Sequence, residues 1–290
     1  MNRIKRSQPL LGTFVEITLE GRTSEERLHQ DASKAFDLIR FVASLMSFHD
    51  PNSDVSRLNR CGHLAPLTVH PWTWQVIAQA VKLSAASEGA FDITIAPKLV
   101  EWGFLPEHES LTAQVGKARW RDLELGPNQT IYFRRPLQID LGGIAKGFAV
   151  DKAIDWLSAR PIQRAIVNAG GDLRVSGIDS EAVCIRHPAA PQTQFHPTEM
   201  LRPAVATSAA YFAQRRHGGS LVCPIVHPET QQSLRSQVSV SVFAPTCILA
   251  DALTKTVLLA PAPIRDRLLR EHDSVALCLP RRGHPILYPN

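Results

Sequence analysis

The sequence predicts an α+β fold in which mixed or antiparallel sheets are flanked by helices. Two observations support this class. Segments with the alternating pattern of strands come in adjacent groups, as at 165–175, and a cleanly alternating strand recurs at 238–242. Long segments with helical spacing, such as 24–48, separate these groups. Because a doubly wound parallel sheet is built from single strands that alternate with helices, this order favours α+β instead.

The first third of the chain is predicted to contain one strand followed by helices. Residues 14–19 alternate between apolar and polar side chains, as a half-buried strand does. Apolar residues recur at helical spacing over 24–48, and Pro51 is expected to stop that helix. A short helical turn at 54–59 and a longer helix at 72–87 are expected next.

The remaining two thirds are predicted to mix both kinds of element. Residues 101–127 are polar and poorly periodic, so irregular structure and a short helix are expected there. The proline-rich segment 188–203 is predicted to be a surface loop. The other expected elements are a strand at 131–133, a helix at 144–157, a hairpin at 165–175, strands at 183–185 and 238–242, and a helix at 248–259. Without a repeat or a linker, we predict one domain over residues 1–290, or two intertwined subdomains.

Composition excludes several classes of protein. The 290 residues, 44% hydrophobic and 20% charged, are those of an ordinary globular chain. The net charge of +5 comes from scattered lysines and arginines without interleaved aromatic residues, so no nucleic-acid partner is expected. No apolar run reaches the roughly 18 residues of a membrane span, so no membrane insertion is expected.

The cysteines and the N-terminus predict a cellular compartment. The five cysteines are widely spaced and form no C-x-x-C pair, which argues against a disulfide framework and a structural zinc site. The basic first residues are not followed by the apolar run of a signal peptide. We therefore expect a cytoplasmic protein.

The most informative segment is 139–151. A short apolar strand at 137–139 is expected to end in Asp140, and Gly142 and Gly143 lead into a helix that carries Lys146 in its first turns. Unpaired backbone amides and the helix dipole make such a junction a favourable site for phosphate or pyrophosphate. The spacing fits neither the Rossmann glycine pattern nor the P-loop pattern.

Five fragments, taken together, resemble the FAD:protein FMN transferases, the ApbE-like flavin transferases. Their order and spacing match this family along nearly the whole chain. The fragments are Met46-Ser47-Phe48 with Ser56-Arg57-Leu58-Asn59, Gly89-Ala90-Phe91-Asp92-Ile93-Thr94 with Trp102-Gly103-Phe104, Asp140-Leu141-Gly142-Gly143-Ile144-Ala145-Lys146-Gly147, Asn168-Ala169-Gly170-Gly171-Asp172, and Ala250-Asp251-Ala252-Leu253-Thr254.

This resemblance implies an ApbE-like fold and a group transfer. FMN would pass from FAD to a Thr or Ser hydroxyl of an acceptor protein as a phosphoester, AMP would leave, and Mg²⁺ would assist. Phosphoryl transfer needs alignment and charge neutralisation more than covalent catalysis, which suits amides, a lysine and carboxylates. FAD and an acceptor flavoprotein are therefore the expected partners.

The resemblance also assigns roles to single residues. It implies metal ligation by the Gly143 carbonyl, Asp251 and Thr254, and it leaves His227 and Asp92 as candidates for the general base. The implied FAD-binding residues are Met46, Ala90, Phe91, Asp92, Asp140, Lys146 and Thr207. Simpler roles stay open for some of these: Met46 and Phe91 as core residues, Asp92 as the cap of a turn, and 168–172 as a tight turn.

Two departures from the family pattern bear on activity. The family often carries a histidine where this chain has Pro224, and His227, three residues on, is a possible substitute base. The family also places a threonine four residues after the metal-binding aspartate, where this chain has Lys255. Lys255 is one helical turn past Asp251, so its ammonium is expected to pair with that carboxylate and to weaken or replace the metal. The alternative is that Lys255 points away and Thr254 turns in.

These departures leave a second function open. The chain would then be an FAD-binding ApbE-like protein without transferase activity, or a slow FAD pyrophosphatase in which water replaces the acceptor hydroxyl.

Overall fold

A computed structural model describes residues 1–107, 118–177, 181–190, 192, 195–211 and 213–289, and it confirms the α+β class. Its centre is an antiparallel eight-stranded sheet in the order β1-β2-β6-β7-β10-β13-β14-β15. These strands are β1 (Asn2–Leu10), β2 (Thr13–Gly21), β6 (Arg164–Ala169), β7 (Asp172–Ser176), β10 (Ala204–Ala209), β13 (Val238–Ala244), β14 (Val275–Pro280) and β15 (Ile286–Tyr288).

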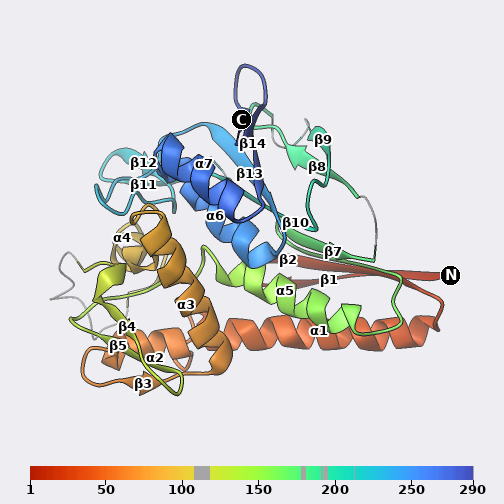
Figure 1. Cartoon of the computed structure of the whole chain (residues 1–290), viewed down its shortest axis with the longest axis horizontal. Coiled ribbons are helices and arrows are strands. Elements are labelled where there is room, and N and C mark those ends of the chain that lie inside the picture. Colours follow the sequence, from red (N-terminus) through yellow and green to blue (C-terminus); the bar gives the residue numbers. More distant parts are fainter. Residues whose placement is uncertain (108–117, 178–180, 191, 193–194, 212, 290) are drawn as a thin grey trace.

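Four helices pack on this sheet and on one another (Figure 1). Helix α5 lies between α1 and α6 and contacts β6 and β7, whereas α6 lies against β10 and β13. Their apolar faces form one continuous core, in which Phe36, Ile154 and Leu253 are almost completely buried. The four helices are α1 (Glu25–Met46), α5 (Ala145–Ser158), α6 (Cys247–Leu259) and α7 (Ala262–Glu271).

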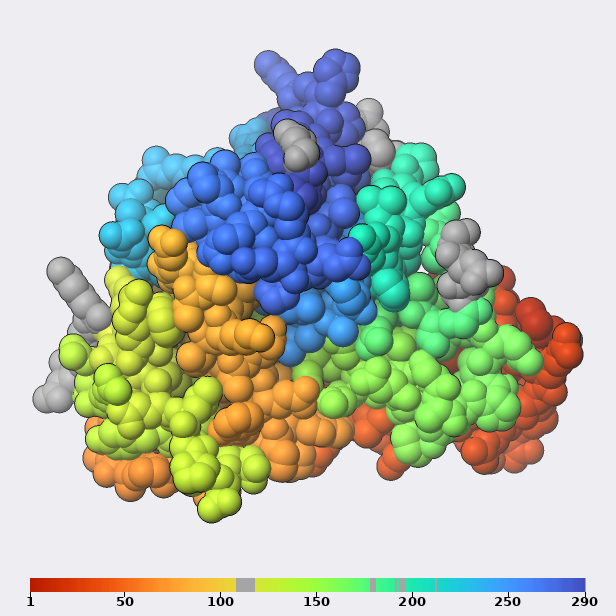
Figure 2. All heavy atoms as spheres, viewed as in Figure 1, coloured from red at the N-terminus to blue at the C-terminus, as the bar shows by residue number. Residues whose placement is uncertain are grey.

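A smaller unit of helices and short strands lies beside the main sheet. It contains a three-stranded sheet in the order β3-β5-β4. Arg267 of α7 donates to the Ala86 carbonyl at the end of α3 over 2.6 Å, and Figure 2 shows these two helices, blue and orange, in contact. The unit consists of α2 (Asp54–Cys61), β3 (Leu67–Thr68), α3 (Pro71–Ala86), 3₁₀ turns at Ile93–Ile95 and Trp120–Asp122, α4 (Ala96–Glu101), β4 (Leu123–Leu125) and β5 (Thr130–Phe133).

Two separate hairpins complete the described structure. β8 (Ala182–Arg186) pairs with β9 (Phe195–Glu199), and β11 (Arg215–His217) pairs with β12 (Ser220–Val222). The expectation of a loop over 188–203 is therefore wrong at 195–199. Pro197 lies in this strand. Proline has no N–H to donate to a neighbouring strand, but both strands of a two-stranded hairpin are edge strands, where proline is tolerated.

Most expected helices and strands are confirmed within a few residues. α1 ends at Met46, two residues before the expected end, and the Ser24 side chain caps its start. The hairpin expected at 165–175 is the β6–β7 pair, whose turn places Gly170 and Gly171 at φ of 67° and 108°. Within 101–127, residues 108–117 lie outside the described part, and the structure adds β4, which was not expected.

One expected strand is absent. Residues 137–139 form no strand, because the Asn59 side chain takes the place of a neighbouring strand. Its amide nitrogen donates to the Ile139 carbonyl over 3.0 Å, and its oxygen accepts from the Ile139 N–H over 2.8 Å. No helix in the described ranges combines the length and apolarity needed to cross a membrane.

Candidate functional site

A cleft of about 1830 Å³ lies where the two units meet. Its walls come from the end of α1, the turn after α3, the segment before α5, the β6–β7 turn, β10 and the end of α6. This volume exceeds the roughly 300–1,000 Å³ of an ordinary small-molecule pocket. The cleft therefore has room for a ligand as large as a dinucleotide together with a segment of a second protein.

The glycine segment before α5 lines this cleft. Asp140 is held in place by its backbone N–H, which donates to the Ile93 carbonyl over 2.8 Å. Its carboxylate accepts the backbone N–H of Gly142. Burial raises the pKa of the Asp140 carboxyl, and the Gly142 amide and the charges of His49 and Lys146 oppose this only in part. The expectation of an unpaired amide at this junction is therefore wrong for Gly142, whose N–H is taken by the Asp140 carboxyl.

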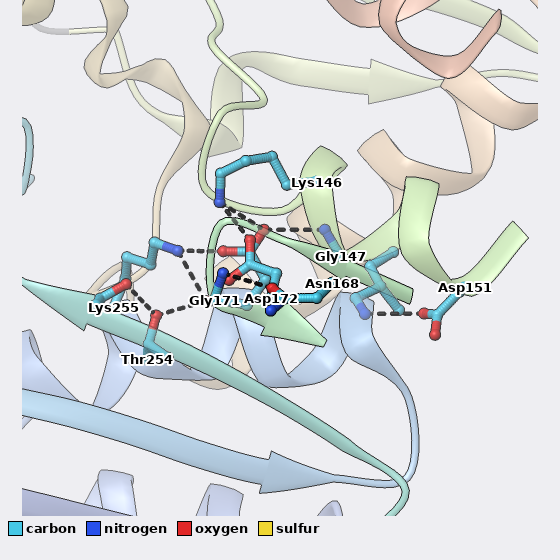
Figure 3. A network of polar contacts seen from close by, with 11 residues as sticks. Lys146, Gly147, Asp151, Asn168, Gly171, Asp172, Thr254 and Lys255 are labelled. Atoms are coloured by element: carbon cyan, nitrogen blue, oxygen red, sulfur yellow. Dashed lines mark hydrogen bonds and ion pairs between the residues drawn. The ribbon is translucent and has the colours of Figure 1, made fainter. Parts of the chain in front are cut away.

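Lys146, in the first turn of α5, forms an ion pair with Asp172 at the start of β7 (Figure 3). Its Nζ also lies 3.8 Å from an oxygen of Asp251, whose side chain is completely buried on α6. Burial lowers the pKa of Lys146, but the two carboxylates outweigh it and leave the pKa above its ordinary value. Lys146 is therefore a permanent cation whose side chain is one third exposed to the cleft.

Lys255 approaches Asp251 from the same helix. Its Nζ pairs with one carboxylate oxygen of Asp251 and lies 3.0 Å from the backbone oxygen of that residue. Burial raises the pKa of Asp251, but Lys146 and Lys255 together outweigh it and lower the pKa below its ordinary value. The expectation that Lys255 pairs with Asp251 is confirmed, and the alternative in which it points away is not observed.

A close approach of α5 and α6 brings these groups together. A Cβ on Gly147 would lie 2.2 Å from the Cys247 carbonyl oxygen, so this position accepts only glycine at the observed helix spacing. The Gly147 N–H donates to Asp251 over 3.2 Å. Asp151, one turn later, accepts the N–H groups of Cys247 and Ile248 and thereby caps α6 (Figure 3).

Thr254 does not present its hydroxyl to the cleft. It is completely buried, its Oγ1 donates to the Asp251 carbonyl over 2.7 Å, and it shares a hydrogen bond of 2.7 Å with Ser208. Thr207 does line the cleft, where its hydroxyl bonds to Ser241 over 2.8 Å. Of these two neighbours on β10, Ser208 hydrogen-bonds to Thr254 of α6, whereas Thr207 hydrogen-bonds to Ser241 of β13.

The residues expected to bind FAD all reach this one cleft. Met46 and Phe91 line it and are also nearly buried in the core, so the core role is confirmed and the flavin-binding role stays a prediction. Ala90, directly before Phe91, also lines the cleft. The full set that the structure brings together is Met46, Ala90, Phe91, Asp92, Asp140, Lys146 and Thr207, with Gly143 and Lys255 beside them.

The two candidate bases differ in position. Asp92 lines the cleft, but its oxygens accept from the Thr94 N–H and hydroxyl, both over 2.8 Å, and from the Trp120 N–H over 3.3 Å. Burial raises the pKa of this carboxyl, and those hydrogen bonds oppose the shift. It therefore caps a turn, as the simpler interpretation proposed.

His227 is not among the residues that line the cleft, although Pro224, Ile225, Val226 and Pro228 are. Its Nδ1 accepts the Thr230 N–H over 3.3 Å, so the ring closes its own turn. The structure therefore does not bring this histidine to the other candidate residues.

Asp172 is the residue that sequence reasoning undervalued. Its side chain is almost completely buried, and burial together with the charge of Asp251 raises the pKa of its carboxyl. The sequence segment that contains it, 168–172, was interpreted as a tight turn, which it is. The sequence feature that could have indicated its role is an aspartate directly after two glycines. An aspartate can both close a turn and pair with a cation.

Comparisons with known proteins agree with this geometry. The model of the ApbE family matches residues 11–279. A curated FAD:protein FMN transferase of Vibrio cholerae serotype O1 is 28% identical over 270 residues, covering 87% of this chain and 79% of the relative. The FAD:protein FMN transferase of Escherichia coli K12 is 25% identical over 280 residues, covering 90% and 80%.

Solved structures share the fold. The ApbE protein of Thermotoga maritima superposes with a TM-score of 0.83 at 23% identity, covering 98% of this chain and 96% of that one. The flavin transferase ApbE of Vibrio cholerae superposes with a TM-score of 0.80 at 24% identity, covering 99% and 96%.

Proposed function

We propose that this chain, which belongs to the ApbE family, transfers FMN from FAD to a Thr or Ser hydroxyl of an acceptor protein and releases AMP. The observation that carries the proposal is spatial. Segments near residues 46, 91, 140, 172 and 255, which are far apart in the sequence, line a single cleft that is large enough for FAD and an acceptor segment.

The chemistry of the cleft suits a pyrophosphate. Lys146 supplies a permanent positive charge in the first turn of α5, and the Gly143 segment precedes that helix. Such charges stabilise a phosphoryl group in transfer mainly by alignment and neutralisation. We assign the diphosphate of FAD to this place, where Lys146 would draw charge from the bond that breaks as AMP leaves.

The apolar wall of the cleft suits a flavin ring. Met46 offers a thioether and Phe91 an aromatic ring, and the two residues come from separate segments of the sequence. Asp140 lines the same cleft and can form a hydrogen bond with the bound flavin nucleotide. Thr207, on β10, lines the cleft as well.

Of the two candidate bases, we favour Asp92. It lines the cleft, whereas His227 closes its own turn. A carboxylate has about four acceptor sites, so three hydrogen bonds leave one for an acceptor hydroxyl. The raised pKa of Asp92 also makes it a better proton acceptor than an ordinary aspartate.

The test is product analysis with an acceptor domain known to carry FMN on threonine. The purified chain is incubated with FAD and the acceptor, and the acceptor mass, free FMN and AMP are measured. The proposal expects an acceptor heavier by one FMN and an equal amount of AMP. Free FMN with an unmodified acceptor would indicate hydrolysis instead. If neither modified acceptor nor free FMN forms, the chain only binds FAD.

A matched pair of variants assigns the activity to the cleft. Lys146→Met removes the cation at the α5 start, and Lys152→Met removes a lysine of the same helix that lies 4.9 Å from the Phe148 ring. We expect the first variant to lose about 10²–10³-fold in transfer rate and the second to retain it.

A further inference from the structure

The Lys255 side chain occupies the place where the ApbE resemblance puts a divalent cation. The residues it implicates as metal ligands are Gly143, Asp251 and Thr254. A Cβ built on Gly143 would lie 3.4 Å from Cε of Lys255, so the lysine stem runs directly past that glycine. Its Nζ then ends on the Asp251 carboxylate.

The side-chain oxygens of Asp251 and Thr254 are already used. One Asp251 oxygen pairs with Lys255, and the other accepts the Gly147 N–H over 3.2 Å and faces Lys146 at 3.8 Å. The Thr254 hydroxyl bonds to the Asp251 carbonyl and to Ser208. Even where waters and substrate phosphates complete its octahedral shell, Mg²⁺ needs a carboxylate that is not paired with another cation, and Asp251 is paired with Lys255. Over the described ranges, no group of three or more His, Cys, Asp or Glu side chains could hold a metal.

The charges of the two ion pairs already balance. Lys146 and Lys255 supply two positive charges, and Asp172 and Asp251 supply two negative ones. A dication at Asp251 would lie within contact distance of an ammonium, and this repulsion is strong in a buried setting. Mg²⁺ could enter only if Lys255 moved away.

We infer that the Lys255 ammonium replaces the divalent cation in this chain, so that FAD binding is independent of Mg²⁺. Lys255 lines the cleft beside Gly143 and Lys146, and its side chain is 19% exposed there. Its ammonium therefore lies beside the place assigned to the FAD diphosphate. This inference rests on the proposed function, because it identifies the cation that meets the diphosphate.

The test uses the whole chain and measures metal and flavin binding separately. Mn²⁺ binding is followed by the loss of the paramagnetic resonance signal of the free ion, and FAD binding is followed by calorimetry with Mg²⁺ or with a chelator. Three proteins are compared: the wild type, Lys255→Thr, and Lys152→Thr as the matched control. Thermal unfolding checks that each variant is folded.

We expect the wild type and Lys152→Thr to leave the Mn²⁺ signal unchanged and to bind FAD equally with Mg²⁺ or chelator. Lys255→Thr should bind FAD about tenfold or more weakly in chelator, since a charge-assisted contact is lost, and Mn²⁺ and Mg²⁺ should bind it and restore FAD affinity. If Lys255→Thr is unfolded, the wild-type titrations alone decide.

Stoichiometric Mn²⁺ binding by the wild type, or FAD binding that chelator abolishes, would overturn the inference and leave the proposed function intact. If FAD does not bind under any condition, the proposed function fails. The Mn²⁺ titration then still decides whether Lys255 excludes a divalent cation from Asp251.

Discussion

Lys146 of α5 and Asp172 of β7, 26 residues apart in sequence, form an ion pair at the edge of the cleft. The lysine is partly exposed, but the aspartate is almost completely buried. The charge of Asp172 is therefore compensated mainly by Lys146. Through this contact the helix that carries the proposed diphosphate site is fixed to the central sheet. The same residues thus serve both stability and the site.

Breaking this pair from one side should destabilise the fold. Lys146→Met leaves a buried carboxylate uncompensated, and we expect a loss of about 3 kcal/mol in the free energy of unfolding. The double variant with Asp172→Asn should recover most of that loss, because the remaining charge is gone. Urea unfolding of the two single variants and the double variant completes the cycle. Simple additivity of the two single effects would contradict the coupling.

Asp140 should make stability depend on pH in the direction opposite to that of an ordinary salt-bridged aspartate. Because burial raises its pKa above 3.8, the folded state keeps a proton that the unfolded state has already lost. Its favourable contribution is therefore present at low pH and is lost as the pH rises through the folded-state pKa. Asp140→Asn should gain stability relative to the wild type at about pH 7 and show a smaller gain at about pH 4. Thermal unfolding across this range measures it, and a difference that does not change with pH would refute the assignment.

Asp151 should be a strong stabiliser of the α5–α6 contact. Asp151→Ala removes the acceptor of the Cys247 and Ile248 N–H groups, which are 2.8 and 2.9 Å away, and a partner of Arg174. We expect a loss of about 3 kcal/mol in the free energy of unfolding. Asp155→Ala is the matched control, because Asp155 bonds to the same arginine over 2.9 Å but is mostly exposed. That variant should lose less than about 1 kcal/mol. Equal losses would mean that the arginine contact, not the cap, carries the effect.

The cysteines should divide into two classes by reactivity. Cys61 and Cys184 are exposed, whereas Cys223, Cys247 and Cys278 are buried. Burial also raises the pKa of Cys278 to about 11, which keeps its thiol protonated and unreactive at neutral pH. Alkylation of the native protein followed by peptide mass mapping should label the first two alone. Rapid labelling of Cys247 would show that α5 and α6 separate readily.

Some periodic elements were predictable from the sequence, but β1, β10, β14, β15 and α7 were not among the expected elements, and contacts between distant segments were not predictable. The helices α5 and α6 and the β6–β7 hairpin follow from apolar spacing and from the paired glycines at 170 and 171. The apolar run at 137–139 was interpreted as a strand because local pattern cannot reveal that Asn59, 80 residues away, satisfies its backbone. β9 was missed because its proline suggested a loop.

The candidate site divides in the same way. Lys146 and Asp140 were predicted to lie at one site because both belong to the local glycine–helix segment, although the strand expected before it at 137–139 is absent. The pairing of Lys255 with Asp251 was also predictable, since four residues in a helix make one turn. The involvement of Asp172 and the displacement of His227 from the cleft depend on how the β6–β7 turn and the 224–231 turn fold onto the helices. No local pattern records such placement.

A crystal structure of the chain with FAD bound tests the proposed function most directly. We expect the diphosphate within hydrogen-bond distance of Lys146 Nζ and beside Gly143, with the isoalloxazine ring against Met46 and Phe91. FAD bound outside this cleft, or in it with the diphosphate away from Lys146, would contradict the proposed site.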